Sequence, residues 1–147
     1  MKWILGLLLM LPSLGTPAQG TAEAKAVAQF QAEKNPDAKK ALAVNFEKSY
    51  PKSRRLPDVY MELSRSLVGG SDFVGAKQYA EKAISAVEKL KAQPTPLENT
   101  DKTWHEWLSS MDASAKSNLT WVNQMAARQQ QQLRGLLNGG ARNKGKD

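Results

Sequence analysis

The chain has 147 residues, 41% of them hydrophobic, and its 21 Lys and Arg outnumber its 14 Asp and Glu to give a formal net charge of +7. This length fits one domain at most. The absence of cysteine excludes disulfides, thiolate nucleophiles, zinc–thiolate sites and iron–sulfur clusters. The single histidine, His105, excludes sites that need several histidines, so we expect neither a metal nor a cofactor.

The first twenty residues have the three parts of a secretory signal peptide. Lys2 is positively charged, an apolar run follows from Trp3 to Leu11, and Ala18-Gln19-Gly20 places small residues where a signal peptidase cleaves. The run is short of the roughly 20 residues that span a bilayer. We therefore expect residues 1–20 to be removed, after Gly20 or Ala18, and the product to be exported to the periplasm or secreted. A retained anchor is the alternative.

Helical spacing of apolar residues recurs after residue 20, and no segment alternates long enough for a strand. Pro12, Gly15 and Pro17 should break any helix near the signal segment, and a first helix is expected over the Ala-rich residues 21–34. A second is expected over residues 36–50, with Asn35 as its N-cap and Pro36 in its first turn. The expected apolar faces are Val27 and Phe30 in the first helix, and Ala38, Leu42, Phe46 and Ser49 in the second.

The middle of the sequence is expected to form a helical hairpin. A helix from about Pro57 ends at Gly69-Gly70, and Ser71 or Asp72 caps a second helix that stops before Pro94. Two antiparallel helices joined by so short a turn pack side by side. The expected apolar faces are Leu56, Tyr60, Leu63 and Leu67 in the first helix, and Phe73, Ala76, Ala80, Ala83, Ile84, Val87 and Leu90 in the second.

Residues 100–137 keep helical phase with no Gly or Pro until Gly135. They form either one long helix, which we favour, or a hairpin that turns near Ser114 to Asn118. Residues 21–137 are then the helical domain, and residues 138–147 are a disordered basic tail. Such a tail can touch a membrane surface weakly. Because it has no aromatic residue for base stacking, no nucleic-acid partner is expected.

The spacing of the central hairpin matches a known repeat. Tyr60, Leu63, Leu67, Ala76, Ala80 and Ala83, together with the string from Gly70 to Ile84 (GSDFVGAKQYAEKAI), resemble one tetratricopeptide repeat. Four positions depart from the family pattern: Ser64 stands for Gly, Leu67 for Tyr, Ala80 for an aromatic residue and Glu88 for Pro. Upstream, the string from Phe46 to Ser53 (FEKSYPKS) resembles a helix end in envelope-associated repeat proteins, including the β-barrel assembly lipoprotein group. The likeness then covers about residues 37–91.

The resemblance implies an all-α fold in which antiparallel helical hairpins stack as a short tetratricopeptide-like solenoid, followed by the long C-terminal helix. An unrelated helical bundle is the alternative, since Ala at helical spacing is common in packed helices. The family implies a non-enzymatic scaffold or adaptor of the bacterial cell envelope that binds a peptide or partner helix in a groove. Because two hairpins are few for a solenoid, self-association is also open.

The family's groove is lined by the first helix of each hairpin. At the matching positions of this sequence it would carry Asp58, Met61 and Arg65, with Arg54 and Arg55 at its rim. Arginines there would favour partners that carry carboxylates.

Two other groups of residues near the start of the last helix suggest a function. Asp101, His105 and Ser109 share one helix face and offer a carboxylate, an imidazole and a hydroxyl, which makes an envelope enzyme or enzyme subunit the alternative function. A catalytic triad also needs an oxyanion hole in a closed pocket, and nothing in the sequence supplies one. Trp104 and Trp107, with Trp121, could contact a partner or close the end of the helical stack, and we favour the second role.

Overall fold

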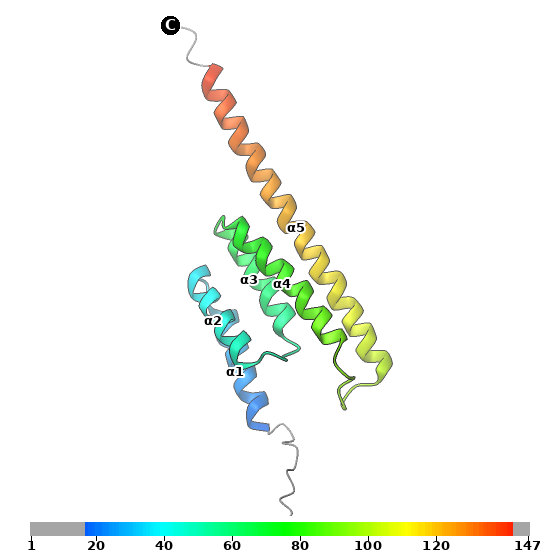
Figure 1. The fold of residues 1–147 in the computed structure, drawn as a ribbon. Coiled ribbons are helices and arrows are strands. Elements are labelled where there is room, and N and C mark those ends of the chain that lie inside the picture. The colour runs from blue at the N-terminus through cyan, green and yellow to red at the C-terminus, as the bar shows by residue number, and fades with distance from the viewer. Residues whose placement is uncertain (1–16, 143–147) are drawn as a thin grey trace, which may run out of the picture.

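The computed structural model describes residues 17–142, which contain five α-helices and no strand (Figure 1). This confirms the predicted all-α fold with a long C-terminal helix. Residues 1–16, most of the expected signal peptide, and residues 143–147 of the expected tail lie outside the described residues. Within the described range, no helix combines the length and hydropathy needed to cross a membrane. The helices are α1 (Pro17–Ala32), α2 (Pro36–Ser49), α3 (Leu56–Gly69), α4 (Phe73–Lys91) and α5 (Asp101–Arg142).

The first two helices begin at prolines. α1 begins at Pro17, four residues before the predicted start at residue 21. The missing N–H of Pro17 costs nothing there, because the first N–H groups of a helix have no partner within the helix. α2 is capped as predicted: the Asn35 Oδ1 accepts hydrogen bonds from the N–H groups of Asp37 and Ala38 at 2.9 and 3.1 Å.

The buried face of α2 differs from the predicted one. Ala38 and Ser49 are exposed, whereas Lys39 is buried together with Ala43 and Phe46. The Lys39 ammonium lies 4.9 Å from the centre of the Phe30 ring and pairs with Glu62 of α3 at 2.5 Å. A long lysine can bury its methylene groups when its charge is paired, which a pattern of apolar residues does not register.

The turn between α3 and α4 depends on Asp72. Its Oδ1 accepts a hydrogen bond from the Gly75 N–H at 2.9 Å, so Asp72 rather than Ser71 is the cap. Gly75 makes room for this carboxylate, because a Cβ at that position would lie 2.3 Å from the Asp72 Oδ2. Ser71 instead turns the backbone, with a positive φ of 64°.

The α3–α4 hairpin holds the centre of the core. Ala76, Ala80 and Ala83 are completely buried, and these small side chains let α4 lie directly against α3 and its Leu63. Tyr79 is buried as well, although it lies outside the predicted face, and its ring centre is 6.0 Å from that of Tyr60. The α1–α2 pair lies on one side of this hairpin and α5 on the other (Figure 1).

α5 is one continuous helix, so the alternative of a hairpin near Ser114 to Asn118 is wrong. Asn118 is buried and joins α5 to α3: its amide donates to the Ser64 Oγ at 2.6 Å, and its Oδ1 accepts from the Arg65 Nε at 2.9 Å. The helix continues past residue 138, where a disordered tail was predicted, to Arg142. Extending a helix that already exists costs only about 1 kcal/mol per glycine.

The two ends of α5 have different surroundings. Its first half packs along α4, whereas its C-terminal part projects beyond the other helices (Figure 1). On that projecting part Leu133, Leu136 and Leu137 are exposed.

Candidate functional site

A cavity of about 420 Å³ lies between α1 and α3, and we call it the α1–α3 cavity. Four of the five residues predicted to bind a partner line it, namely Arg55, Asp58, Met61 and Arg65. They come together because positions three and four apart share one face of a helix. Val27 and Phe30 of α1 line the same cavity.

The α1–α3 cavity has an apolar floor. Val27, Phe30 and Met61 are all buried members of the main core cluster. Met61 was predicted as a contact on an open groove, but in the structure it contributes to this floor and is 5% exposed. Its substitution would therefore change the core as well as the cavity.

Charged side chains surround this floor. Burial raises the pKa of Asp58, and the neighbouring Arg55 and Arg65 oppose that rise. The Glu62 carboxylate, which pairs with Lys39, raises the pKa of Asp58 further. The two arginines thus face one partly desolvated carboxylate, and the cavity combines positive and negative groups around an apolar centre.

Arg65 is less free than the sequence suggested. Its Nε donates to the Asn118 Oδ1, which joins it to α5, but its side chain remains exposed at the cavity. Arg55 is also exposed, and no side-chain hydrogen bond or ion pair holds its guanidinium within residues 17–142. Arg55 is therefore the arginine that is available to a ligand without breaking a contact inside the protein.

Arg54 does not line the α1–α3 cavity; together with Arg55 it borders a separate hollow beside Glu23 of α1. Its guanidinium pairs with Glu98, donates to the Asn99 Oδ1 at 3.2 Å and lies 5.8 Å from the centre of the Trp104 ring. These contacts join the α2–α3 connection to the α4–α5 connection. Of these two adjacent arginines only Arg55 also lines the α1–α3 cavity, a difference that the sequence alone did not resolve.

Trp104 and Trp107 close the end of the α4–α5 pair that lies next to the connection between the two helices. Their rings stack with centres 5.0 Å apart, and Trp104 is only 2% exposed in a small cluster with Leu90 and Leu108. The packing role that the sequence favoured accounts for Trp104. Trp107 is partly exposed, so it is the one of the two that a partner could reach.

The row of Asp101, His105 and Ser109 does not form a proton-relay arrangement. The His105 Nδ1 lies 2.6 Å from the backbone carbonyl oxygen of Asp101, not from its carboxylate. His105 and Ser109 line a shallow surface hollow with Lys91 and Asp112. Within the described part of the protein, no group of three His, Asp or Glu side chains is placed to hold a metal ion.

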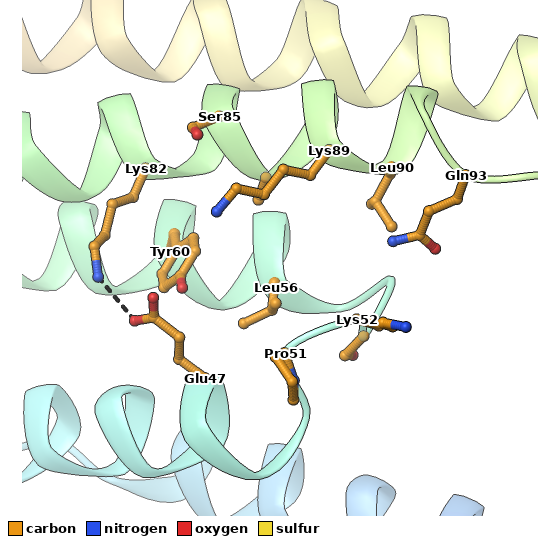
Figure 2. Close-up of a pocket in the computed structure, with 12 residues that line it drawn as sticks. Glu47, Pro51, Lys52, Leu56, Tyr60, Lys82, Ser85, Lys89, Leu90 and Gln93 are labelled. Atoms are coloured by element: carbon orange, nitrogen blue, oxygen red, sulfur yellow. Dashed lines mark hydrogen bonds and ion pairs between the residues drawn. The ribbon is translucent and has the colours of Figure 1, made fainter.

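A second cavity, of about 260 Å³, was not predicted from the sequence. It lies between the end of α2, the start of α3 and one face of α4, and we call it the α2–α4 cavity (Figure 2). Glu47 and Lys82 form an ion pair at its edge, with Lys82 Nζ 2.8 Å from Glu47 Oε2. Lys82 and Lys89 are seven residues apart on one face of α4, which is the signal that could have revealed the site.

The Glu47–Lys82 ion pair changes the pKa of Glu47 itself and of the nearby Tyr60. Burial alone would raise the pKa of Glu47, but the bonded Lys82 ammonium lowers that pKa overall. Burial, together with the Glu47 carboxylate, raises the pKa of the Tyr60 hydroxyl, which stays protonated at any physiological pH. At neutral pH the Glu47 carboxylate is therefore ionised beside a neutral phenol.

Comparison of the sequence and the fold with protein-family models, with curated proteins and with solved structures finds no match. The fold and the two cavities therefore define the protein as an all-α protein of packed helices with a cavity on each side of α3.

Proposed function

We propose that this protein is a non-enzymatic interaction module, similar to a tetratricopeptide-repeat protein, that binds a short peptide segment in the α1–α3 cavity. One observation carries the proposal: residues chosen from the repeat spacing converge on a cavity with an apolar floor and two arginines. In a tetratricopeptide-like stack the first helix of each hairpin lines the groove, and here α1 and α3 both line the cavity.

The lining indicates the chemistry of the segment. Val27 and Met61, which are 6% and 5% exposed, offer a small apolar contact for one side chain of the ligand, while Arg55 and Arg65 can hold a carboxylate. Asp58 and Glu62 would repel a segment with several acidic residues in a row. The segment that fits best pairs an apolar residue with one or two carboxylates rather than a long acidic run.

We place this module in the bacterial cell envelope because the first twenty residues match a signal peptide. Cleavage after Ala18 or Gly20 would remove only the first residues of α1. It would keep Glu23, whose carboxylate accepts a hydrogen bond from the Ser53 Oγ at 2.5 Å. Intact-mass measurement of exported material should then give an N-terminus at Gln19 or Thr21, and a membrane-bound species that keeps Met1 would contradict export.

Selection of peptides tests the binding proposal. A random dodecapeptide library selected on the full-length protein should be enriched in sequences with an apolar residue near an acidic one. Arg55→Glu should weaken binding of a selected peptide by about tenfold or more, because attraction becomes repulsion. Arg55 is preferred to Arg65, whose reversal would also break the bond to Asn118.

Lys40→Glu is the matched control, because it makes the same charge change on an exposed side chain of α2 that does not line the cavity. It should leave peptide binding unchanged, and circular dichroism should show both variants folded. Equal binding by wild type and Arg55→Glu would contradict the proposed site.

A further inference from the structure

We infer that the α2–α4 cavity is a second binding site, and that it takes a ligand in which one carboxylate is attached to an apolar group. The inference does not depend on the proposed function, because the two cavities have no lining residue in common. Leu56 and Tyr60 face the α2–α4 cavity, whereas Asp58 and Arg65 face the other one. At 100° per residue these pairs lie on opposite faces of α3.

The charged residues that line the cavity favour an anionic ligand. Three lysines line it, Lys52, Lys82 and Lys89, and Glu47 is the only acidic residue among them. Glu47 is already paired with Lys82 at 2.8 Å. In residues 17–142 no carboxylate pairs with Lys89 or Lys52. Both lysines therefore lack an ion pair in this range, although Lys89 lies near enough to Glu47 to help lower the pKa of that carboxyl.

The positions of these lysines favour a single negative charge. In Figure 2 the Lys89 side chain runs back along α4 toward Tyr60, over the cavity, whereas the Lys52 ammonium points away from it. One free ammonium inside the site matches one carboxylate better than a doubly charged phosphate. Lys82 is occupied by Glu47 and holds it in place.

The remaining wall supplies the apolar half of the site. Leu56, Ala86 and Leu90 are almost completely buried where they border the cavity, so an apolar ligand group would cover the edge of the core. A volume of about 260 Å³ suits one side chain of leucine size with a carboxylate beside it. Ser85 and Gln93 lie at opposite ends of the α4 side of the cavity, and either of them can hydrogen-bond a peptide group of the ligand.

This chemistry is found in the C-terminus of a peptide that ends in an apolar residue and in a free medium-length fatty acid. Three probes separate these sources: acetyl-Ala-Ala-Leu with a free carboxylate, the same peptide as its C-terminal amide, and octanoate. Binding to the full-length protein is measured by chemical-shift titration. We expect at least one of the two carboxylates to bind with shifts at residues that line the cavity, and the amide to bind about tenfold more weakly or not at all.

The ratio of the binding affinities of the two carboxylate probes identifies which kind of ligand the site takes. Tighter binding of the peptide than of octanoate assigns the site to the C-terminus of a peptide, and the reverse assigns it to a free acid. Either result supports the inference. Equal binding of the peptide and its amide, or no binding of either carboxylate at millimolar concentration, would overturn it.

Lys89→Gln tests the residue on which the inference depends most. This side chain is exposed and makes no ion pair among the described residues, so its loss should not unfold the protein. It should weaken carboxylate binding by about tenfold. Lys77→Gln, an exposed position on α4 outside the cavity, is the matched control and should bind like wild type. Unchanged binding in a folded Lys89→Gln variant would also overturn the inference.

Discussion

The α3–α4 hairpin and the projecting part of α5 both carry apolar residues at helical spacing, but their surroundings are opposite. Leu63 of α3 is completely buried, whereas Leu137 of α5 is 76% exposed. α3 is contacted by α2, α4 and α5, and the end of α5 extends beyond these helices (Figure 1). The comparison teaches that an apolar helix face contributes to the core only where another helix covers it. The following substitutions test how far the energetics of the two regions differ.

The largest contrast is expected from one substitution made in both regions. Leu63→Ala should lower the free energy of unfolding by about 2–5 kcal/mol, because it opens a cavity in a core that cannot collapse fully. Leu137→Ala should change it by less than about 0.5 kcal/mol, because both residues favour helix and the side chain is exposed. Urea unfolding measures both. Equal effects would mean that the end of α5 is covered in solution.

Enlarging a side chain in each region should give the next largest difference in stability. Ala83→Leu should destabilise by about 1–3 kcal/mol, since α3 lies directly against this fully buried position. Ala127→Leu adds the same atoms to an exposed position of α5 and should be nearly neutral. If thermal unfolding of Ala83→Leu matched wild type, the helix register of the hairpin would be wrong.

The polar contact between the hairpin and α5 should have a similar or smaller effect. Asn118→Ala removes the hydrogen bonds to Ser64 and Arg65 and should cost about 1–3 kcal/mol. Asn123→Ala, at an exposed position on the same helix, is the control. The loss should appear as a lower midpoint in urea. A neutral Asn118→Ala would show that apolar packing alone holds α5 against α3.

The smallest effect concerns pH and the α1–α3 cavity. Burial raises the pKa of Asp58 in the folded protein, so the folded state binds a proton more tightly than the unfolded state. The stability that Asp58 contributes should therefore fall as pH rises from its unfolded pKa through its folded pKa. Asp58→Asn should gain stability relative to wild type across that window. Parallel curves of unfolding free energy against pH for the two proteins would contradict the raised pKa.

Much of the helical architecture follows from short-range chemistry that the sequence shows directly. Asn35 and Asp72 are strong caps, and the small residues of α4 mark a close helix contact, so the hairpin could be predicted. The continuous α5 could be favoured but not established, because its Ser and Asn residues also suit a turn. In the structure the buried Ala115 and Val122 and the contact of Asn118 with α3 hold that segment against the other helices.

The features that were missed depend on contacts between distant segments. Lys39 is buried because Phe30 and Glu62 approach it from other helices, and the Arg54 guanidinium contacts Glu98 and Trp104 instead of lining the α1–α3 cavity. The α2–α4 cavity is assembled from three elements, so no single stretch of sequence displays it. The same limit applies to Arg65, whose bond to α5 joins residues 53 positions apart.

Photo-crosslinking tests the central claim, recognition of a peptide between α1 and α3, most directly. A peptide selected on the full-length protein would carry a benzophenone at its apolar position, and mass spectrometry would locate the attachment after irradiation. The account predicts attachment to Val27, Phe30 or Met61, which form the floor of the α1–α3 cavity, and much less attachment in Arg55→Glu. Attachment to Trp107 on α5, unchanged in Arg55→Glu, would contradict it and move the site to the C-terminal helix.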